Sequence, residues 1–271
     1  MKKFSVDGKT ELKDFLALSL NISKKKAKNI VDSKNVFVNH KRVWISSYLL
    51  KAGDVVEAVY SDQEKPVDIK ILFEDDFIIA IDKPALIISE SDPGSMESLL
   101  RKARNDNNIV AIHRLDKETS GALLFAKNNS VFEAFKQMWS AKEVQKVYLA
   151  ISFTEAIFRE KIIDHSIDGK SAVSHVQVIN KKRGFTYFRI RIETGRKYQI
   201  RKHLNFIRHP IVGDKFIGMK VIENPYIKNV KRQMLHASTL SFNHPYTKSL
   251  LTIESPLPPD MVSVLKGLGL I

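Results

Sequence analysis

AIHRLDKETSGALLFAKN, residues 111–128, places a polar loop directly before an apolar strand. Asp116 lies in the loop, and a Thr-Ser-Gly run leads into the strand at Leu123–Ala126. This order holds an acidic side chain in an ordered loop at a strand edge, where functional side chains often lie. A lone aspartate in a loop is more often a turn residue whose carboxylate binds nearby backbone amides. The segment alone therefore leaves both roles open for Asp116.

Short β-branched segments surround this loop. They predict strands at Ile78–Ile81, Val147–Ile151 and Tyr187–Ile192, whereas helical spacing is rarer and is clearest at Val131–Trp139. This mixture favours an α+β domain built on a mixed or antiparallel sheet.

The first 60 residues predict a smaller unit. Apolar residues at helical spacing predict a helix over residues 10–20, with Thr10 as its cap. Ser23 precedes a second helical stretch, in which lysines surround a narrow apolar stripe. Alternating segments on either side of Asn39–His40 predict a hairpin, and residues 50–60 supply one more strand.

A polar segment that contains a proline separates this unit from the rest of the chain. The segment reads SDQEKPVD and covers residues 61–68. Such composition is typical of a boundary between domains. We therefore predict an N-terminal domain at residues 1–62 and a larger domain at residues 63–271.

The chain is strongly basic. Its 271 residues include 44 Lys and Arg against 30 Asp and Glu, which gives a formal charge of +14. Residues 181–235 hold 15 Lys and Arg against 3 Asp and Glu, so this segment alone contributes +12. A local surplus of this size indicates a polyanionic partner, nucleic acid first and an anionic membrane surface second.

Several other classes of protein lose support. The chain has no cysteine, which removes disulfides, thiolate metal sites and cysteine nucleophiles. No histidine lies in H-E-x-x-H or a comparable ligand spacing, and both glycine-rich phosphate motifs are missing. No apolar run is long enough to span a bilayer, and the charged start MKKFSVDGKT has no signal-peptide core. We expect a cytoplasmic monomer without metal, cofactor or membrane contact.

HRLDKETSG resembles the active-site motif of the RluA family of RNA pseudouridine synthases. Other blocks of that family follow in the right order: EDDFIIAIDKPA (74–85), KVYLA (146–150), TGRKYQIRKHL (194–204), HPIVGDKF (209–216) and LHASTLSFNHP (235–245). The first 60 residues resemble an S4 domain, a small α/β RNA-binding module, at ISKKKAKNIV, VFVN and KAGDVV. Together the resemblances cover nearly the whole chain.

The resemblance implies a cofactor-free isomerase that converts uridine to pseudouridine in structured RNA, ribosomal RNA of the large subunit first and transfer RNA second. It implies that Asp116 is the catalytic carboxylate, that Tyr148 stacks on the uracil and helps to remove the C5 proton, and that Arg201 pairs with Asp116. A guanidinium suits this task because it stays protonated and offsets the burial of a carboxylate. Without the resemblance, Tyr148 fits a core aromatic, and Arg201 fits a phosphate contact or a solvated charge.

RNA contacts are expected from both domains. A target base in folded RNA must be flipped out, and Arg114 is expected to fill the gap that it leaves, with a structural salt bridge as the alternative. The remaining expected contacts are basic or imidazole side chains: His113, Lys24, Lys25, Lys26, Lys28, Arg42, Arg196 and Lys197.

A few positions depart from the family's pattern. Tyr198 stands where the family usually has histidine, and Leu86 and Arg208 stand at usual glycine positions. In the S4 region, Lys34–Asn35 replaces a glycine at the hairpin entry, and asparagine is the better suited of the two to left-handed geometry. These departures bear on loop shape and substrate choice.

Two other functions fit parts of the sequence. A non-catalytic RNA-binding or ribosome-assembly protein would need only the S4 module and the basic stretch. An RNA methyltransferase would need a glycine motif for its cofactor, and none is present. Because Asp116, Tyr148 and Arg201 are all in place, we favour the synthase.

Overall fold

The computed structural model describes residues 1–59, 67–217 and 225–271. The chain divides into two units, Met1–Val67 and Asp68–Ile271. The predicted boundary between residues 62 and 63 lies outside the described residues. Within the described ranges, no helix is long and apolar enough to cross a membrane.

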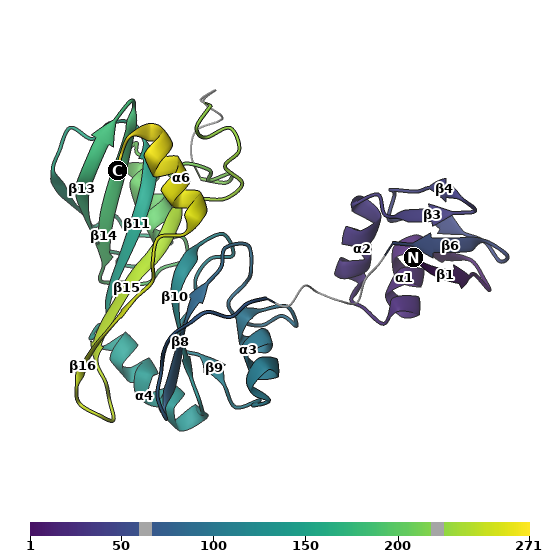
Figure 1. The fold of residues 1–271 in the computed structure, drawn as a ribbon, viewed down its shortest axis with the longest axis horizontal. Coiled ribbons are helices and arrows are strands. Elements are labelled where there is room, and N and C mark those ends of the chain that lie inside the picture. Colours follow the sequence, from purple (N-terminus) through teal and green to yellow (C-terminus); the bar gives the residue numbers. More distant parts are fainter. Residues whose placement is uncertain (60–66, 218–224) are drawn as a thin grey trace. The chain divides into compact units, whose positions relative to one another are not determined.

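In its described residues, the first unit contains two helices and a four-stranded antiparallel sheet in the order β1-β6-β3-β4 (Figure 1), together with a two-stranded sheet of β2 and β5. Its elements are β1 (Lys2–Ser5), β2 (Thr10–Glu11), α1 (Leu12–Leu20), α2 (Lys24–Asp32), β3 (Val36–Val38), β4 (Lys41–Arg42), β5 (Leu49–Leu50) and β6 (Val55–Ala58).

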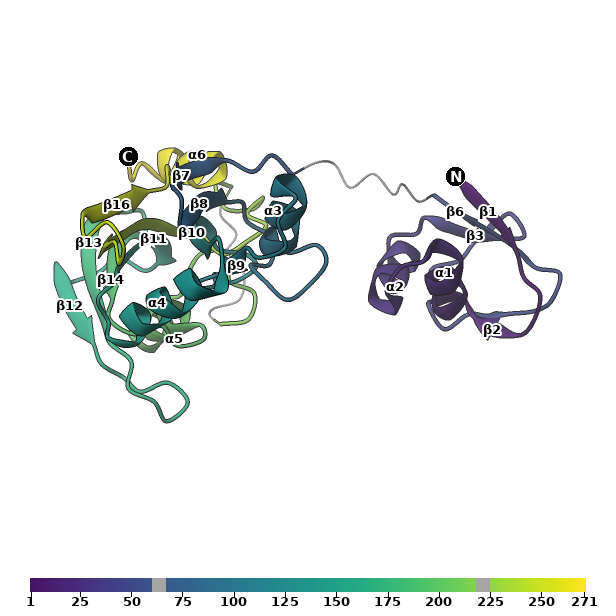
Figure 2. The ribbon, with the colours of Figure 1, turned by 90° about the horizontal axis from the view of Figure 1, so that it is seen from below.

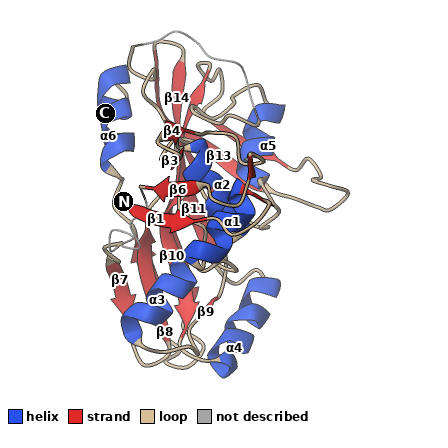
Figure 3. Ribbon diagram, turned by 90° about the vertical axis from the view of Figure 1, so that its right-hand side faces the viewer, coloured by secondary structure: helices blue, strands red, loops and turns tan. Residues whose placement is uncertain are grey.

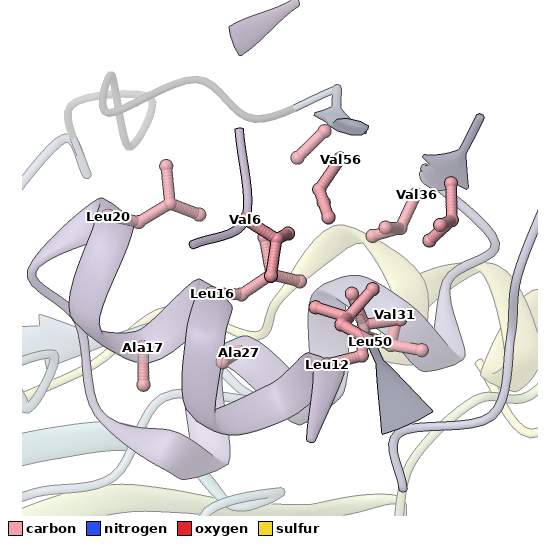
Figure 4. Close-up of a cluster of buried hydrophobic side chains, with 12 residues drawn as sticks. Val6, Leu12, Leu16, Ala17, Leu20, Ala27, Val31, Val36, Leu50 and Val56 are labelled. Carbon is pink, nitrogen blue, oxygen red and sulfur yellow. The ribbon is translucent and has the colours of Figure 1, made fainter. Parts of the chain in front are cut away.

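The two helices and the sheet of this unit share one apolar core (Figure 4). α1 contributes Leu12, Leu16 and Leu20, and α2 contributes Ala27 and Val31, which are buried at the helical spacing seen in the sequence. Because the stripe of α2 is so narrow, most of its lysines remain exposed on the other faces.

The turn chemistry of this unit was predicted in part. Ser23 caps α2, since its Oγ accepts the N–H of Lys26 at 3.2 Å. Asn39 and His40 both have positive φ, as the predicted hairpin turn requires. The predicted Thr10 cap is wrong: Thr10 lies in β2, and α1 begins after Glu11 without a side-chain cap. A strand pairing with β5 takes the place of the cap.

The second unit is built on one large mixed sheet, whose strands follow the order β12-β13-β14-β11-β15-β10-β8-β7, with β16 beside β15 and β9 beside β10. Its strands are β7 (Ile71–Glu74), β8 (Ile78–Lys83), β9 (Val110–Ala111), β10 (Ser120–Ala126), β11 (Gln145–Phe153), β12 (Glu160–Ile163), β13 (Ser174–Lys182), β14 (Phe185–Ile192), β15 (Leu235–Asn243) and β16 (Leu250–Glu254). Its helices are α3 (Met96–Arg104), α4 (Asn129–Ser140), α5 (Gln199–Phe206) and α6 (Pro259–Leu268). The predicted α+β class is confirmed.

Helices cover both faces of this sheet. Figures 2 and 3 show α4 and α5 on one side and α6 on the other. Val131, Phe135 and Met138 of α4 are buried in a cluster with side chains of β8, β10 and β15. The predicted helix at Val131–Trp139 therefore forms, as α4.

Three helices of the second unit were not predicted. α5 lies within the basic stretch, and its buried face includes Gln199, Arg201 and His203. α3 buries only Met96 and Leu100. In these two helices, polar or sparse buried faces hide the apolar period on which a helix prediction depends. α6 is different, because it buries Met261, Val264, Leu265 and Leu268 at helical spacing and was missed although the pattern is present.

Three departures from the family's glycines have one physical basis. Lys34, Leu86 and Arg208 adopt φ values of 61°, 71° and 62°. This left-handed conformation costs side chains other than glycine about 1–2 kcal/mol. In the S4 region it is Lys34 that takes the left-handed conformation, so the preference given to Asn35 was wrong.

Candidate active site

The register of three central strands brings the Asp116 loop beside Tyr148. β10 and β15 form a parallel pair, in which Gly121 faces Ala237. On the other side of β15, Tyr148 of β11 also faces Ala237. A register shift follows Val147, and such bulges often re-aim a side chain at an active site.

Gly121 permits the close approach of β10 and β15. Its φ is +121°, and a Cβ at this position would lie 2.2 Å from the carbonyl oxygen of Ala237. No other residue fits without moving one strand. The glycine that ends HRLDKETSG therefore fixes where the loop meets the sheet.

Neighbouring segments brace the Asp116 loop from two sides. Ser89 Oγ accepts the N–H of Leu115 at 2.9 Å and donates to its carbonyl at 3.0 Å. Gln233 Nε2 donates to Thr119 Oγ1 at 2.7 Å. The backbone on both sides of Asp116 is thus held in place.

A buried lysine, Lys83, also holds the Asp116 loop in place. The Lys83 ammonium donates to three backbone carbonyls, those of Pro84, Ile87 and Lys117, at 2.8, 2.6 and 3.4 Å. Burial and the charge of Arg232 lower the pKa of Lys83 to about 7, and Asp116 acts in the opposite direction. Lys83, the last residue of β8, therefore links that strand to the Asp116 loop through its hydrogen bond to the Lys117 carbonyl.

Arg201 of α5 links two carboxylates. Its Nη1 lies 3.3 Å from Asp116 Oδ2, so the predicted pair forms. Its Nε and Nη2 donate to the two oxygens of Asp214, at 2.6 and 2.8 Å. Burial acts to lower the pKa of Arg201, but hydrogen bonds and charge from Asp214, and then Asp116, raise it above its ordinary value.

The backbone conformation of Gly213 orients Asp214 toward Arg201. Gly213 has a φ of +79°, and a Cβ there would lie 2.1 Å from the carbonyl oxygen of Arg232. Asp214 Oδ1 also accepts the N–H groups of Phe216 and Ile217, each at 3.0 Å. Asp214 was not predicted as a site residue, although the HPIVGDKF block contains it.

Two tyrosines complete the walls of the site. The ring of Tyr198, at the left-handed residue before α5, lies 4.4 Å from the Arg201 guanidinium carbon. Tyr198 thus covers one face of that cation, in the position where the family usually has histidine. Tyr148 is buried, and burial followed by the charge of Asp116 raises the pKa of its phenol. The phenol is therefore neutral near pH 7.

These side chains line a cavity of about 100 Å³, with Asp116, Tyr148, Tyr198 and Arg201 in its wall. α5 contributes Gln199, Ile200 and Arg201 to the wall of this cavity, and α5 lies on the same side of the sheet as α4 (Figure 2). Asp116 keeps 28% of its side chain exposed, whereas Arg201 keeps 6%. The carboxylate is therefore the accessible member of the pair.

The predicted RNA contacts of the second unit lie near this cavity, but they differ in exposure and in charge. Arg114 is 66% exposed and its Nη1 lies 3.8 Å from Glu90. His113 stacks on Trp139, and its Nε2 accepts the N–H of Leu124 at 3.2 Å. Burial, and then the charge of Lys146, lower the pKa of His113 to about 3, so its ring carries no charge.

Arg196 and Lys197 are exposed in the loop before α5. Arg196 Nε donates to the carbonyl of Ser171 at 3.0 Å. In contrast, Arg232 of the same basic stretch is buried in a two-pronged ion pair with Asp260. Only part of the +12 segment is therefore available to a polyanion.

In the first unit, Lys24, Lys25, Lys28 and Arg42 are exposed. Lys24 Nζ lies 3.0 Å from Asp14 Oδ1, and the Arg42 guanidinium lies over Phe37 at 5.2 Å. Lys26 is partly buried. These side chains lie on α2 and β4, apart from the core of the unit.

Comparison with known families gives two matches. Residues 77–206 match the model of RNA pseudouridylate synthase, and residues 12–56 match the S4 domain. A ribosomal large subunit pseudouridine synthase D of Nitrosomonas europaea is 32% identical over 254 residues, which cover 84% of this chain and 73% of the relative. The chain belongs to the RNA pseudouridine synthases. It is thus an isomerase that converts uridine to pseudouridine in RNA.

Other relatives agree with this synthase family. An uncharacterised RNA pseudouridine synthase of Bacillus subtilis is 30% identical over 255 residues, which cover 82% of each chain. Among solved structures, human RNA pseudouridylate synthase domain containing 4 has a TM-score of 0.63 at 22% identity and covers 74% of this chain and 93% of its own. That likeness shows the fold.

Within the described part of the synthase, no group of three or more His, Cys, Asp or Glu side chains could hold a metal ion. Arg114, Arg196 and Arg201 line the cavity, and Lys83 lies against the Asp116 loop. Of these, Lys83 was missed by the sequence analysis, although it lies in the IDKPA segment.

Proposed function

We propose that this synthase modifies specific uridines in structured RNA, with large-subunit ribosomal RNA as its principal substrate and transfer RNA as the second, and that Asp116 is its catalytic carboxylate. The observation that carries the proposal is the Arg201–Asp116 contact, 3.3 Å long, in the wall of a cavity beside Tyr148. Several relatives are named ribosomal large subunit pseudouridine synthase D, which supports the choice of RNA.

The reaction moves a glycosidic bond within one nucleotide. The N1–C1′ bond of uridine breaks, a C5–C1′ bond forms, the C5 proton leaves, and N1 gains a proton. Substrate and product have the same atoms, so the reaction requires no oxidant, reductant or group donor. The proposal therefore includes no cofactor.

The proposed roles follow from the setting of each side chain. Asp116 is exposed to the cavity and acts on the uridine, while Arg201 neutralises its charge and holds its position. Tyr148 supports the uracil ring. Because burial raises the pKa of Tyr148, little of it is present near neutral pH as the phenolate that could accept a proton. If Tyr148 helps to remove the C5 proton, a proton acceptor must lie next to its phenol. We propose Asp116 for this part, because the Asp116 carboxylate is close enough to raise the pKa of the phenol.

Exposed cations of both units contribute to RNA binding in this proposal. Arg114 lines both cavities, and in this proposal its side chain fills the gap left by a flipped base. The α2 lysines and Arg42 of the S4 domain bind phosphates, with Arg196 and Lys197 beside the active site. We propose that the protein acts as a monomer in the cytoplasm.

Tritium release tests the substrate. Transcripts of large-subunit ribosomal RNA, small-subunit ribosomal RNA and transfer RNA carry tritium at uridine C5, and the enzyme must expel this hydrogen as the new bond forms. We expect release from large-subunit RNA above the other transcripts. Release from transfer RNA alone would contradict the choice of substrate. Tight RNA binding without release from any transcript would favour a non-catalytic binding protein.

Removal of residues 1–62 tests the S4 domain. We expect weaker RNA binding and a flatter dependence of affinity on salt, because several phosphate-binding lysines are lost. Filter binding at several KCl concentrations measures both. An unchanged affinity and salt slope would remove the S4 domain from the binding surface.

A further inference from the structure

A second cavity adjoins the one that contains Asp116. It has a volume of about 520 Å³, in the range of small-ligand clefts. Arg114, Tyr148, Gly195 and Arg196 line both cavities, so the two are neighbours. The second cavity is therefore next to the place where the proposed function puts the target uridine.

The lining of this cavity is cationic. Five of its side chains are Lys or Arg (Arg114, Lys136, Lys142, Lys146 and Arg196) and two are Glu (Glu90 and Glu193), a formal charge of 5 − 2 = +3. Both glutamates have a side-chain partner. Glu90 faces Arg114 at 3.8 Å, and Glu193 faces His175 at 2.6 Å.

Lys146 is the unusual member of this lining. Only 4% of the residue is exposed. In the described ranges, its ammonium has no ion pair and no hydrogen-bond acceptor, and its contact is with the ring of Trp139, 5.7 Å away. Burial, followed by the charge of Lys142, lowers the pKa of Lys146. The stem of Lys146 is buried, whereas its ammonium keeps some exposure to the cavity, where an anion can reach it.

The position of Lys146 is fixed by its surroundings. It lies on β11 two residues before Tyr148, and Trp139 of α4 is held in turn by the stacked ring of His113 at 4.9 Å. A cation over an indole face is attracted to it, but the ring supplies no hydrogen-bond acceptor for the ammonium. The ammonium is therefore oriented and still lacks an anion.

We infer that Lys146 binds a backbone phosphate of the substrate RNA next to the target uridine, in the cavity formed by α4, β11 and the loop before α5. The inference rests on the proposed function for the identity of the RNA. A phosphodiester supplies the anionic oxygens that the ammonium lacks, and the other charged side chains of the lining, four cations against two glutamates, favour the same charge. Lys146 adjoins Tyr148 along the strand, so the bound phosphate fixes the RNA beside the uracil site.

The test compares Lys146→Met with Lys102→Met in the full-length enzyme. Methionine keeps most of the apolar stem and removes the charge. Lys102 is an exposed lysine of α3 that lies outside both cavities, so it controls for the loss of one positive charge. Binding to a large-subunit ribosomal RNA transcript is measured over a series of KCl concentrations, together with kcat, KM and Tm.

We expect Lys146→Met to weaken RNA binding about tenfold and to reduce the slope of log Kd against log salt by about one relative to Lys102→Met. Most of the loss in kcat/KM should appear in KM. The Tm should stay close to that of the wild type, since the ammonium faces the cavity and forms no ion pair in the described ranges. Lys146→Arg should recover most of the affinity, because it restores the cation.

Equal affinity and equal salt slope in the two methionine variants would overturn the inference. So would a fall in Tm with no change in the salt slope, because that pattern indicates a structural lysine. If Lys146→Met fails to fold, Lys146→Gln takes its place. If the wild type releases no tritium from any transcript, the proposed function fails, whereas the salt titration still tests the phosphate contact.

Discussion

The loop that carries Asp116 and the loop that carries Asp214 each present a carboxylate to Arg201, but they leave these carboxylates in different states. Asp214 is 1% exposed and accepts four hydrogen bonds, two from Arg201 and two from backbone N–H groups. Asp116 is 28% exposed and accepts one, at 3.3 Å. A carboxylate has about four lone-pair sites, so Asp214 is saturated and Asp116 is not.

This difference assigns a supporting role to Asp214 and a role in the reaction to Asp116. A saturated, buried carboxylate holds Arg201 but has no free oxygen for a substrate. An accessible carboxylate with one partner can accept contacts from a uridine while the arginine balances its charge. We therefore expect changes on the Asp214 side to act on stability, and changes at Asp116 to act on turnover.

Arg201→Met removes the element that the two loops share, so it should have the largest effect. It leaves the buried Asp214 carboxylate without its cation, which typically costs about 3–5 kcal/mol. We expect a strong loss of stability in urea unfolding, together with loss of tritium release. Arg201→Lys should have a stability between those of the wild type and Arg201→Met, since an ammonium keeps the charge but cannot form the two-pronged contact with Asp214. A loss below about 1 kcal/mol would show that Asp214 does not depend on Arg201.

Asp214→Asn should destabilise the second unit by about 2 kcal/mol, because it weakens hydrogen bonds to a charged group. Arg201 retains Asp116, so tritium release should fall but remain measurable at a temperature where the variant is folded. Urea unfolding and single-turnover release measure the two effects. Unchanged stability with no turnover would reverse the roles assigned to the two carboxylates.

Leu86→Gly and Arg208→Gly should change the stability least, and they should raise it, whereas the variants above lower it. Both residues are left-handed; Leu86 N–H donates to the carbonyl of Lys117 in the Asp116 loop, and Arg208 precedes the segment that leads to Asp214. We expect each glycine to stabilise the fold by about 1 kcal/mol, whereas alanine at either position keeps the left-handed cost and should not.

These glycine variants also sharpen the comparison. If the conformation of Leu86 shapes the reactive loop, Leu86→Gly should lower kcat while Arg208→Gly leaves it unchanged. Equal kcat values in both would mean that Leu86 matters only for folding. Chemical denaturation and steady-state tritium release distinguish these results.

The sequence predicted those parts of the molecule that lie in contiguous motifs. Asp116, Tyr148 and Arg201 stand in recognisable blocks, the Arg201–Asp116 pair forms, and the Ser23 cap and the Asn39–His40 turn follow from local chemistry. Local chemistry failed at Thr10, where a strand pairing with β5 replaces the cap.

The remainder depends on tertiary contacts. Asp214 becomes a partner of Arg201 only because Gly213 packs against the carbonyl of Arg232, a contact between segments 19 positions apart in the chain. Lys146 looks like an ordinary strand lysine until Trp139 and the neighbouring strands bury it. α5 escaped prediction because its buried side includes polar residues.

The central claim is that Asp116 acts on the substrate while Asp214 only supports Arg201. Single-turnover tritium release, with enzyme in excess over a C5-labelled transcript, compares the wild type with Asp116→Asn and Asp214→Asn below the lowest of the three Tm values. We predict no release by Asp116→Asn, with RNA affinity and Tm close to the wild type, and slow but complete release by Asp214→Asn. Release by Asp116→Asn at the wild-type rate would contradict the account.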